Sequence, residues 1–388
     1  MTVRITKPEF NLREKLSELD KPVGLKGSEL IRSDNVQYAR DLIGAGRKNM
    51  IYNGAMTIAQ RATSKTGITA NGYYACDRWH LQLNGPTVTL AQDSDNPGYG
   101  FKKSLALTVT TAVSSISAGN ALKLRYLVEG YDAAQLQYGT THAKPFTLSF
   151  WVKSSLTGQF AISFTRDSRI VNRQVTVNSA NTWEHKSVTI LGDVTTALGN
   201  TTNGTGMIIN IFPSSGSNST GGASIRQWNS YHNAHTAFGA NMGHLTVTNS
   251  TFKITGVQME VGKVATEFEH RPHAEELSLC KRYYQQVGPA SSSVMILAGA
   301  GNGTSRIRGM HQLIPEMRDT PTTTADTSSE NFTFYAYSGG AVTYSSVNGF
   351  SGTSKNIHWD FNTSTHNREG LDFDVKGSGA RLQIDAEL

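Results

Sequence analysis

Short runs in which apolar and polar residues alternate recur throughout residues 49–272, and they constrain the fold more than any other feature of the chain. Clear examples are Leu105–Thr110, Phe146–Val152, Phe160–Phe164 and Trp183–Ile190. Each run is bounded by Gly, Asn, Ser or Pro, which favour turns. Because successive side chains of a strand point to opposite faces, such runs are typical of half-buried strands. The pattern favours two packed antiparallel sheets over βαβ units.

Two further runs, Ile208–Phe212 and Phe252–Glu260, bring the expected set to about eight to ten strands, which a jelly roll accommodates. Residues 213–240 are rich in Gly, Ser and Asn and show little periodicity, so we expect a long surface loop there. We therefore predict a mainly β protein whose largest domain, residues 49–272, is an antiparallel jelly-roll β-sandwich.

The segments on either side differ from the sandwich region. Residues 1–48 contain a capping box at Thr6–Glu9 and leucines at helical spacing between residues 12 and 19. These short helices have too few apolar residues to bury a core alone, so we interpret them as a docking or oligomerisation segment. A flexible leader that packs on its own domain remains the alternative. Residues 273–388 begin with a short helix and continue as short strands, which predicts a second, smaller β-domain.

The composition limits the classes of partner. Charged residues make up 17% of the 388 residues and apolar residues 38%, so Gly, Ser, Thr and Asn supply a polar, uncharged surface that is typical of extracellular or virion β-proteins. No run approaches the roughly 20 apolar residues of a membrane helix, and no export signal is visible, so we expect no membrane insertion. The net charge of +6 is divided among short clusters near residues 166–173, 281–282 and 306–308. A nucleic-acid partner would favour a continuous basic stripe, and we expect none.

The cysteines and the acidic turns predict no cofactor and no metal. Cys76 and Cys280 are far apart and have no metal-type partners nearby, so we interpret them as buried free thiols of a chain folded in a reducing cell. Asp93–Gly98 has oxygen ligands at alternating positions but ends without an acidic residue, and an ordinary turn is favoured over a calcium site. His232 and His235 are interpreted as solvent-exposed loop residues.

No motif predicts a catalytic residue. A glycan-cleaving site needs two carboxylates on either side of a cleft. Asp93, Asp95, Asp132, Asp167 and Asp193 are available, but the sequence indicates no pairing among them. The chain contains no nucleophile elbow, phosphate loop or zinc-protease helix.

Aromatic residues in polar surroundings are the candidate ligand-binding residues, since flat rings stack on the apolar faces of sugars. They occur in the loop near residue 228 and in the C-terminal region. The set is Trp228, Tyr231, Tyr335, Tyr337 and Tyr344. A subunit interface would use the same side chains, and both interpretations remain open. Trp79, Trp151, Trp183 and Trp359 lie in alternating runs, so we expect them in the core.

Three segments together resemble a family of bacteriophage tail-fibre and virion structural proteins, many of them from phages of marine bacteria and cyanobacteria. They are Asn49–Trp79, Phe252–Tyr284, and Leu313–Thr322 combined with the terminal Asp385–Leu388. The resemblance extends from about residue 49 to the end of the chain. It implies a virion component built on a β-sandwich like those of carbohydrate-binding modules, and it assigns no catalytic residue.

The first of these segments also has an interpretation of its own. Asn53–Gly54 is a tight-turn dipeptide. Asp77 and Arg78 are expected to pair and tie a loop to the sheet, while the indole of Trp79 fills the core.

We therefore expect a homotrimeric tail-fibre or tail-associated protein, located in the virion and assembled in the host cytoplasm. Residues 1–48 would dock it to tail or portal-proximal adaptor proteins, and the β-domains would adhere to host-surface glycans. Trimerisation is implied by the resemblance alone. The alternatives are a head or neck decoration protein without receptor binding and, less favoured, a polysaccharide-degrading tail enzyme.

Overall fold

The structure is a computed structural model, and it describes residues 48–287, 294–301, 306–325, 332–336, 341–342, 344–363, 370–375 and 382–388. The predicted helical segment at residues 1–48 lies outside these ranges except for Lys48. Within the described residues, none of the helices is long and apolar enough to cross a bilayer.

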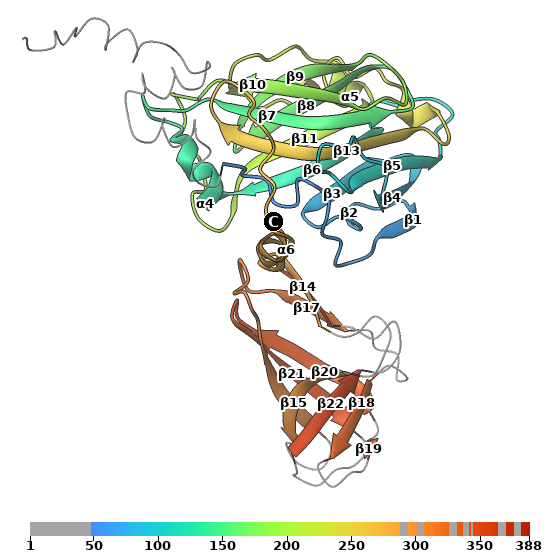
Figure 1. Ribbon diagram of the computed structural model, residues 1–388, viewed down its shortest axis with the longest axis vertical. Coiled ribbons are helices and arrows are strands. Elements are labelled where there is room, and N and C mark those ends of the chain that lie inside the picture. The colour runs from blue at the N-terminus through green and yellow to red at the C-terminus, as the bar shows by residue number, and fades with distance from the viewer. Residues whose placement is uncertain are drawn as a thin grey trace, which may run out of the picture. The chain divides into compact units, whose positions relative to one another are not determined.

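Two antiparallel sheets form the β-sandwich (Figure 1). Sheet A has the strand order β1 (Ser64–Ile68), β4 (Thr87–Asp93), β5 (Ser104–Thr111), β13 (Thr251–Val261), β7 (Phe146–Ser154) and β10 (Glu184–Ile190). Sheet B has the order β12 (Asn229–Ser230), β9 (Arg169–Val177), β8 (Gly158–Arg166), β11 (Thr205–Ser215), β6 (Ala121–Glu129), β3 (Trp79–Asn84) and β2 (Gly72–Tyr73). The mainly β, antiparallel sandwich predicted from the alternating runs is confirmed.

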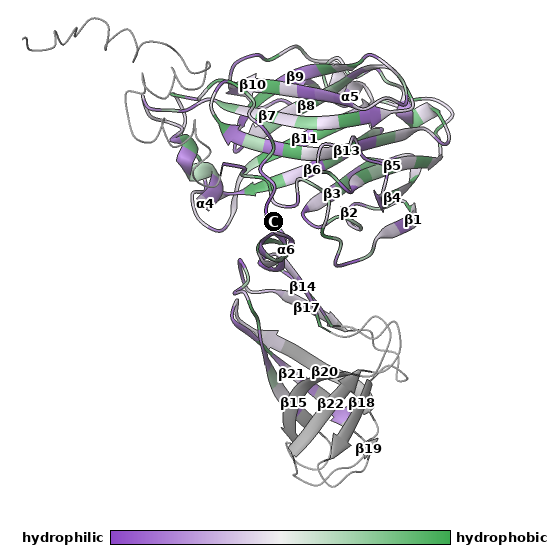
Figure 2. Cartoon of the chain, in the orientation of Figure 1, coloured by the Kyte–Doolittle hydropathy of each residue, from purple (hydrophilic) through white to green (hydrophobic). Residues whose placement is uncertain are grey.

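The core lies between the sheets because the alternating runs present one apolar face each. Strand β7 buries Phe146 and Phe150, and strand β8 buries Phe160 and Phe164 from the opposite sheet. The rings of Phe146 and Phe164 meet edge to face with centroids 4.9 Å apart, and those of Phe150 and Phe160 are 6.1 Å apart. Figure 2 shows hydrophobic and hydrophilic residues alternating along these strands. Edge-to-face aromatic pairs therefore join sheet A to sheet B.

The sheets contain more strands than the alternating runs predicted. The described part of the sandwich has thirteen strands, and the additional ones lie at edges, where β2 and β12 comprise two residues each. Two residues are too few to show a period of two, so no sequence pattern indicates them. Around the sandwich strands lie the short helices α4 (Gly130–Ala133), η1 (Ala134–Leu136), α5 (Ser217–Thr220), η2 (Asn233–His235) and η3 (His244–Thr246).

The predicted loop at residues 213–240 folds onto the outer face of sheet B. Its first residues extend strand β11 to Ser215, and α5, β12 and η2 follow. Ala237 of this segment packs against Ala161 and Phe212, which point outward from β8 and β11. We call residues 216–241 the covering loop.

A short helix and two further sheets follow the sandwich. Helix α6 (His273–Lys281) precedes a sheet with the order β14 (Tyr284–Val287), β23 (Leu382–Asp385) and β17 (Thr322–Ala325). A larger sheet has the order β19 (Ala341–Val342), β18 (Phe332–Ala336), β22 (Gly370–Val375), β15 (Val294–Gly301), β16 (Arg306–Gln312), β21 (Asn356–Thr363) and β20 (Tyr344–Gly352). The predicted additional β-structure after the sandwich is confirmed, whereas the division at residues 272 and 273 remains a prediction.

The last residues of the chain return to the first strands of the sandwich. Glu387 forms an ion pair with Arg78, and both side chains are almost fully buried. The Arg78 guanidinium also lies 3.5 Å from the ring centroid of Tyr283 and donates to the carbonyl oxygen of Leu127. The expected pairing of Arg78 with Asp77 is therefore wrong, since the Asp77 carboxylate accepts from the backbone N–H and side chain of Gln60 instead.

The other expectations for buried residues have mixed outcomes. Trp79 is fully buried, and so are the free thiols of Cys76 and Cys280. Trp359 is also buried. By contrast, Trp151 and Trp183 are only partly buried, on or beside the outer face of sheet A, so their expected core positions are wrong.

Candidate ligand-binding groove

A row of polar side chains crosses the outer face of sheet B. In strand β3 the buried Leu81 and Leu83 point inward, so Gln82 between them points outward. In strand β6 the same alternation turns Lys123 and Arg125 outward. The residue opposite Gln82 is Lys123, and Arg125 lies between His80 of β3 and Asn210 of β11. The register thus aligns amide, imidazole and cationic side chains across neighbouring strands.

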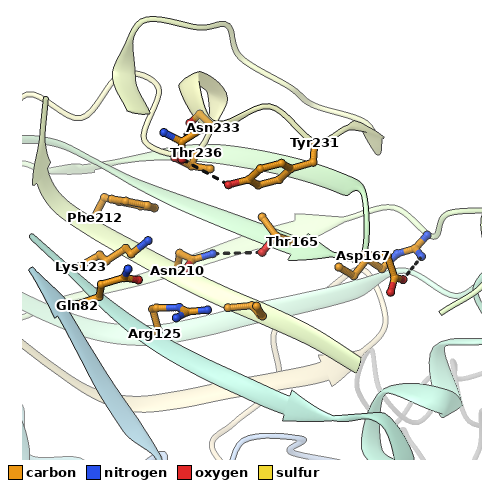
Figure 3. A pocket seen from close by; sticks show the side chains of 12 residues that line it. Gln82, Lys123, Arg125, Thr165, Asp167, Asn210, Phe212, Tyr231, Asn233 and Thr236 are labelled. Atoms are coloured by element: carbon orange, nitrogen blue, oxygen red, sulfur yellow. Dashed lines mark hydrogen bonds and ion pairs between the residues drawn. The ribbon is translucent and has the colours of Figure 1, made fainter. Parts of the chain in front are cut away.

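The covering loop lies over this row and encloses a pocket with a volume of about 430 Å³, whose floor is formed by the row. We call this pocket the groove. Figure 3 shows Tyr231, Asn233 and Thr236 of the loop on the opposite side of the pocket from the sheet residues. The pocket is lined by Gln82, Lys123, Arg125, Thr165, Arg166, Asp167, Ile208, Asn210, Phe212, Tyr231, Asn233 and Thr236. A lining this polar suits a polar ligand, whereas most sites for drug-like molecules are predominantly apolar.

Several polar atoms on this face lack a hydrogen-bond partner among the residues that the structure describes. They are Nδ1 of His80, Oε1 of Gln82, Nε of Arg125 and Oγ of Ser163. Ser163 lies opposite Asn210 in the register, so all four atoms belong to the same outward-facing rows. A buried polar atom without a partner costs about 1–3 kcal/mol, so these groups require hydrogen bonds from water or from a polar ligand.

Two cations lie in the floor of the groove. Burial, together with the neighbouring charge of Arg125, lowers the pKa of Lys123 to about 8. Burial also lowers the pKa of the Arg125 guanidinium. Burial, followed by the charges of Arg125 and Lys123, lowers the pKa of His80 to about 4, so this imidazole is neutral at pH 7. The Lys123 ammonium lies 5.1 Å from the ring centroid of Phe212.

At one end of the groove the charges are already balanced. Arg166 donates to the Asp193 carboxylate over 2.5 Å, and Arg169 donates to the same oxygen over 3.0 Å. Asp167 accepts from the backbone N–H of Gly199 and belongs to the lining. This end is held together by internal ion pairs.

The structure places the predicted aromatic residues in different surroundings. Tyr231 lines the pocket and remains 46% exposed. Trp228 is buried, its Nε1 donates to the carbonyl oxygen of Leu191, and its ring packs against Tyr138. Its ring centroid lies 5.1 Å from the guanidinium carbon of Arg166, which lines the pocket, so Trp228 packs behind the lining and offers no free ring face. Tyr335 and Tyr344 belong to strands β18 and β20, and Tyr337 lies outside the described residues.

The sequence reasoning missed Gln82, Lys123, Arg125 and Asn210. Their signal was the occurrence of long polar side chains at the outward positions of central strands, including two cations two residues apart in β6. An ordinary solvated face has the same pattern, so the register and the covering loop were needed to recognise the groove.

The acidic and histidine candidates have internal partners. The Lys253 ammonium lies 2.7 Å from Asp93 and 2.9 Å from Asp95, so the Asp93–Gly98 turn neutralises its carboxylates with a lysine. Asp132 accepts from the Tyr52 hydroxyl. His235 accepts from the backbone N–H of Ala223 through Nδ1. Among the described residues, no group of His, Cys, Asp and Glu side chains is arranged to hold a metal.

Comparisons with known proteins give structural similarity only. No family model matches the chain, and no curated protein matches it. The enzymatically active domain of tailspike protein 4 of bacteriophage CBA120 is similar over 55% of this chain, with 15% identity and a TM-score of 0.31, and the match spans only 21% of that chain. A CBM4 carbohydrate-binding module matches 55% of this chain and 99% of its own, with 12% identity and a TM-score of 0.28. TmCBM61 in complex with β-1,4-galactotriose matches 56% of this chain and 100% of its own, with 9% identity and a TM-score of 0.27. Similarity at this level does not identify a shared function.

Proposed function

We propose that the groove on sheet B binds a glycan. The observation that supports this proposal most directly is the group of unpartnered polar atoms of His80, Gln82, Arg125 and Ser163 on one face of the sheet. Sugar hydroxyl groups both donate and accept, so a single glycan chain can satisfy an amide oxygen, a guanidinium N–H and a serine hydroxyl together. The ring of Tyr231 at the pocket adds a surface on which a sugar can stack.

We further propose that the chain is a phage tail-fibre or tail-associated protein. This part rests on the resemblance of residues 49–388 to such proteins, and the homotrimer, the docking through residues 1–48 and the location in the virion belong to the same proposal. Several copies on one particle would multiply a weak contact in each groove into firm adhesion. No nucleic-acid or membrane partner is proposed.

Binding without cleavage is the form of this proposal that the lining favours. Glycoside hydrolysis ordinarily requires two carboxylates about 5–10 Å apart. Among the residues that line the described pocket, Asp167 is the only one with a carboxylate. A decoration protein without a ligand is the second candidate, but it gives no reason for a groove of unpartnered polar groups.

Replacing Tyr231 by alanine tests the site. We expect the full-length variant to bind permissive host cells or their purified surface polysaccharide roughly 2- to 10-fold more weakly, because one exposed aromatic contact is lost. Tyr131→Ala is the matched control, since Tyr131 is 61% exposed and does not line the pocket. Fluorescence titration of labelled protein measures both affinities.

Equal affinities of the two tyrosine variants would contradict the groove as the binding site. If the unmodified protein binds neither the cells nor their polysaccharide, the adhesion proposal itself is wrong. Release of reducing ends from the polysaccharide would favour the tail enzyme instead.

A further inference from the structure

We infer that the glycan bound in this groove is acidic, and that a carboxylate or sulfate group of the polysaccharide lies between Lys123 and Arg125. This inference rests on the proposed glycan binding and adds the chemical class of the ligand.

The two cations are placed to contact one anion together. Lys123 and Arg125 are two residues apart on β6, so their side chains leave the same face of the sheet roughly 6–7 Å apart. Both line the pocket, on an interior strand of sheet B next to β11. Among the described residues, neither has a carboxylate within ion-pair distance, and neither donates a hydrogen bond.

Several buried or partly buried cations of the described sandwich are compensated within the chain. Arg78 has Glu387, and Arg166 has Asp193. Lys253 has two aspartates, Asp93 and Asp95. Arg173 donates to several carbonyl oxygens of the covering loop and of β10. Lys123 and Arg125 are partly buried side by side without such a partner among the described residues, and a ligand that carries an anion would offset the cost of this burial.

The surrounding groups favour a sugar acid over a free inorganic anion. The guanidinium of Arg125 offers two parallel N–H groups that match a carboxylate or sulfate. Gln82 and Asn210 flank the cations and are suited to the hydroxyl groups of the same sugar. The two cations form a single pair rather than a continuous stripe, so the groove is less suited to the regular phosphates of a nucleic acid.

The test compares polymers that differ only in charge. Binding of the full-length protein is measured to polygalacturonate and to its methyl ester, and to dextran sulfate and unmodified dextran. We expect at least one acidic polymer to bind about tenfold or more tightly than its neutral counterpart, because a charge-assisted hydrogen bond contributes that much. The pair that shows the difference identifies the anion as a carboxylate or a sulfate.

Three variants assign the effect to the groove. Lys123→Gln and Arg125→Gln should each weaken binding of the acidic polymer about tenfold, and clearly more than they weaken binding of the neutral polymer. Lys65→Gln removes the same charge from an exposed position on β1 in sheet A and should leave both affinities unchanged. Because the two groove cations have no carboxylate partner, their variants should also keep the thermal stability of the native protein, which separates a binding role from a structural one.

The alternative outcomes distinguish failure of the acidic ligand from failure of the proposed function. Equal binding of acidic and neutral polymers in the groove leaves the proposed function intact and contradicts the acidic ligand. Equal effects of the Lys65 and groove variants also contradict it. If single-stranded DNA binds more tightly than every polysaccharide tested, and the Lys123→Gln and Arg125→Gln variants lose this binding, the ligand is a nucleic acid and not a glycan. Absence of binding to every polymer and to host polysaccharide contradicts the proposed function as well.

The pH dependence of binding gives an independent readout. Burial and the charge of Arg125 lower the pKa of Lys123 to about 8. The uncharged Gln82 and Phe212 and the neutral His80 lie beside Lys123, and Asp167 and Tyr231 line the same pocket. An anionic ligand favours the protonated lysine, so affinity should be constant between about pH 5 and 7 and decrease as pH rises through 8. The Lys123→Arg variant should lose this decrease, because a guanidinium stays protonated over that range. An identical decrease in both proteins would contradict the assignment to Lys123.

Discussion

Replacing Glu387 by glutamine lowers the free energy of unfolding by about 3–5 kcal/mol, although the residue is next to last in the chain. The variant keeps the size of the side chain but leaves the Arg78 guanidinium buried without a carboxylate. The ring of Tyr283 and the carbonyl oxygen of Leu127 remain as its partners, and neither carries a charge. Urea unfolding followed by circular dichroism and tryptophan fluorescence measures the loss.

A double-mutant cycle isolates the ion pair from other effects. The single variants Arg78→Met and Glu387→Met each leave one buried charge without its partner, whereas the double variant removes both charges. Its loss in the free energy of unfolding should therefore be clearly smaller than the sum of the losses of the two single variants. Arg308→Met is the surface control. Its side chain is 55% exposed and paired with Asp360, so the expected loss is within about 1 kcal/mol. Additive losses for Arg78 and Glu387 would show that the two do not interact in solution.

Replacing Trp79 by alanine lowers the free energy of unfolding by about 3–5 kcal/mol. Trp79 is fully buried, and its ring centroid lies 5.3 Å from that of Tyr126 on the neighbouring strand. Its Nε1 donates to the carbonyl oxygen of Asn53 over 3.3 Å, so the variant also leaves that carbonyl with one partner fewer. The substitution therefore opens a cavity where the first core strand meets the turn that precedes it.

The matched control is another tryptophan in a different environment. Trp183 is only partly buried, and its Nε1 donates to Asp95 outside the sandwich core. Trp183→Ala should cost roughly 1 kcal/mol, as is usual away from tightly packed positions. If chemical denaturation gives similar losses in the free energy of unfolding for the two variants, the burial of Trp79 in the core does not determine its contribution to stability.

The sequence predicted those parts of the fold that rest on local periodicity. Strands β7, β8 and β13 were recognised because their apolar residues alternate over five residues or more, which fixes one buried face. The edge strands β2 and β12 were not, since two residues have no period. The pairing of Arg78 with Glu387 joins positions 309 residues apart, and no local pattern indicates such a contact.

The groove was predictable only in part, for a similar reason. Tyr231 was identified because an aromatic ring in a polar loop is unusual, and Trp228 satisfied the same criterion although its ring is buried. Lys123 and Arg125 resemble any solvated strand face in sequence. They differ from such residues because, in the part of the chain that the structure describes, no carboxylate compensates them, and this depends on which strands become neighbours in the fold.

The return of the final strand to β14 has a consequence for how such a chain can diversify. Val287, at the end of β14, lies opposite Leu382, at the start of β23, so the chain leaves this strand pair and returns to it at adjacent positions, with β17 of the same sheet between them in sequence. A recombination event with one breakpoint after β14 and the other before β23 would exchange everything between them as a cassette. Arg78 would keep Glu387, and the groove on sheet B would be inherited unchanged by every recombinant.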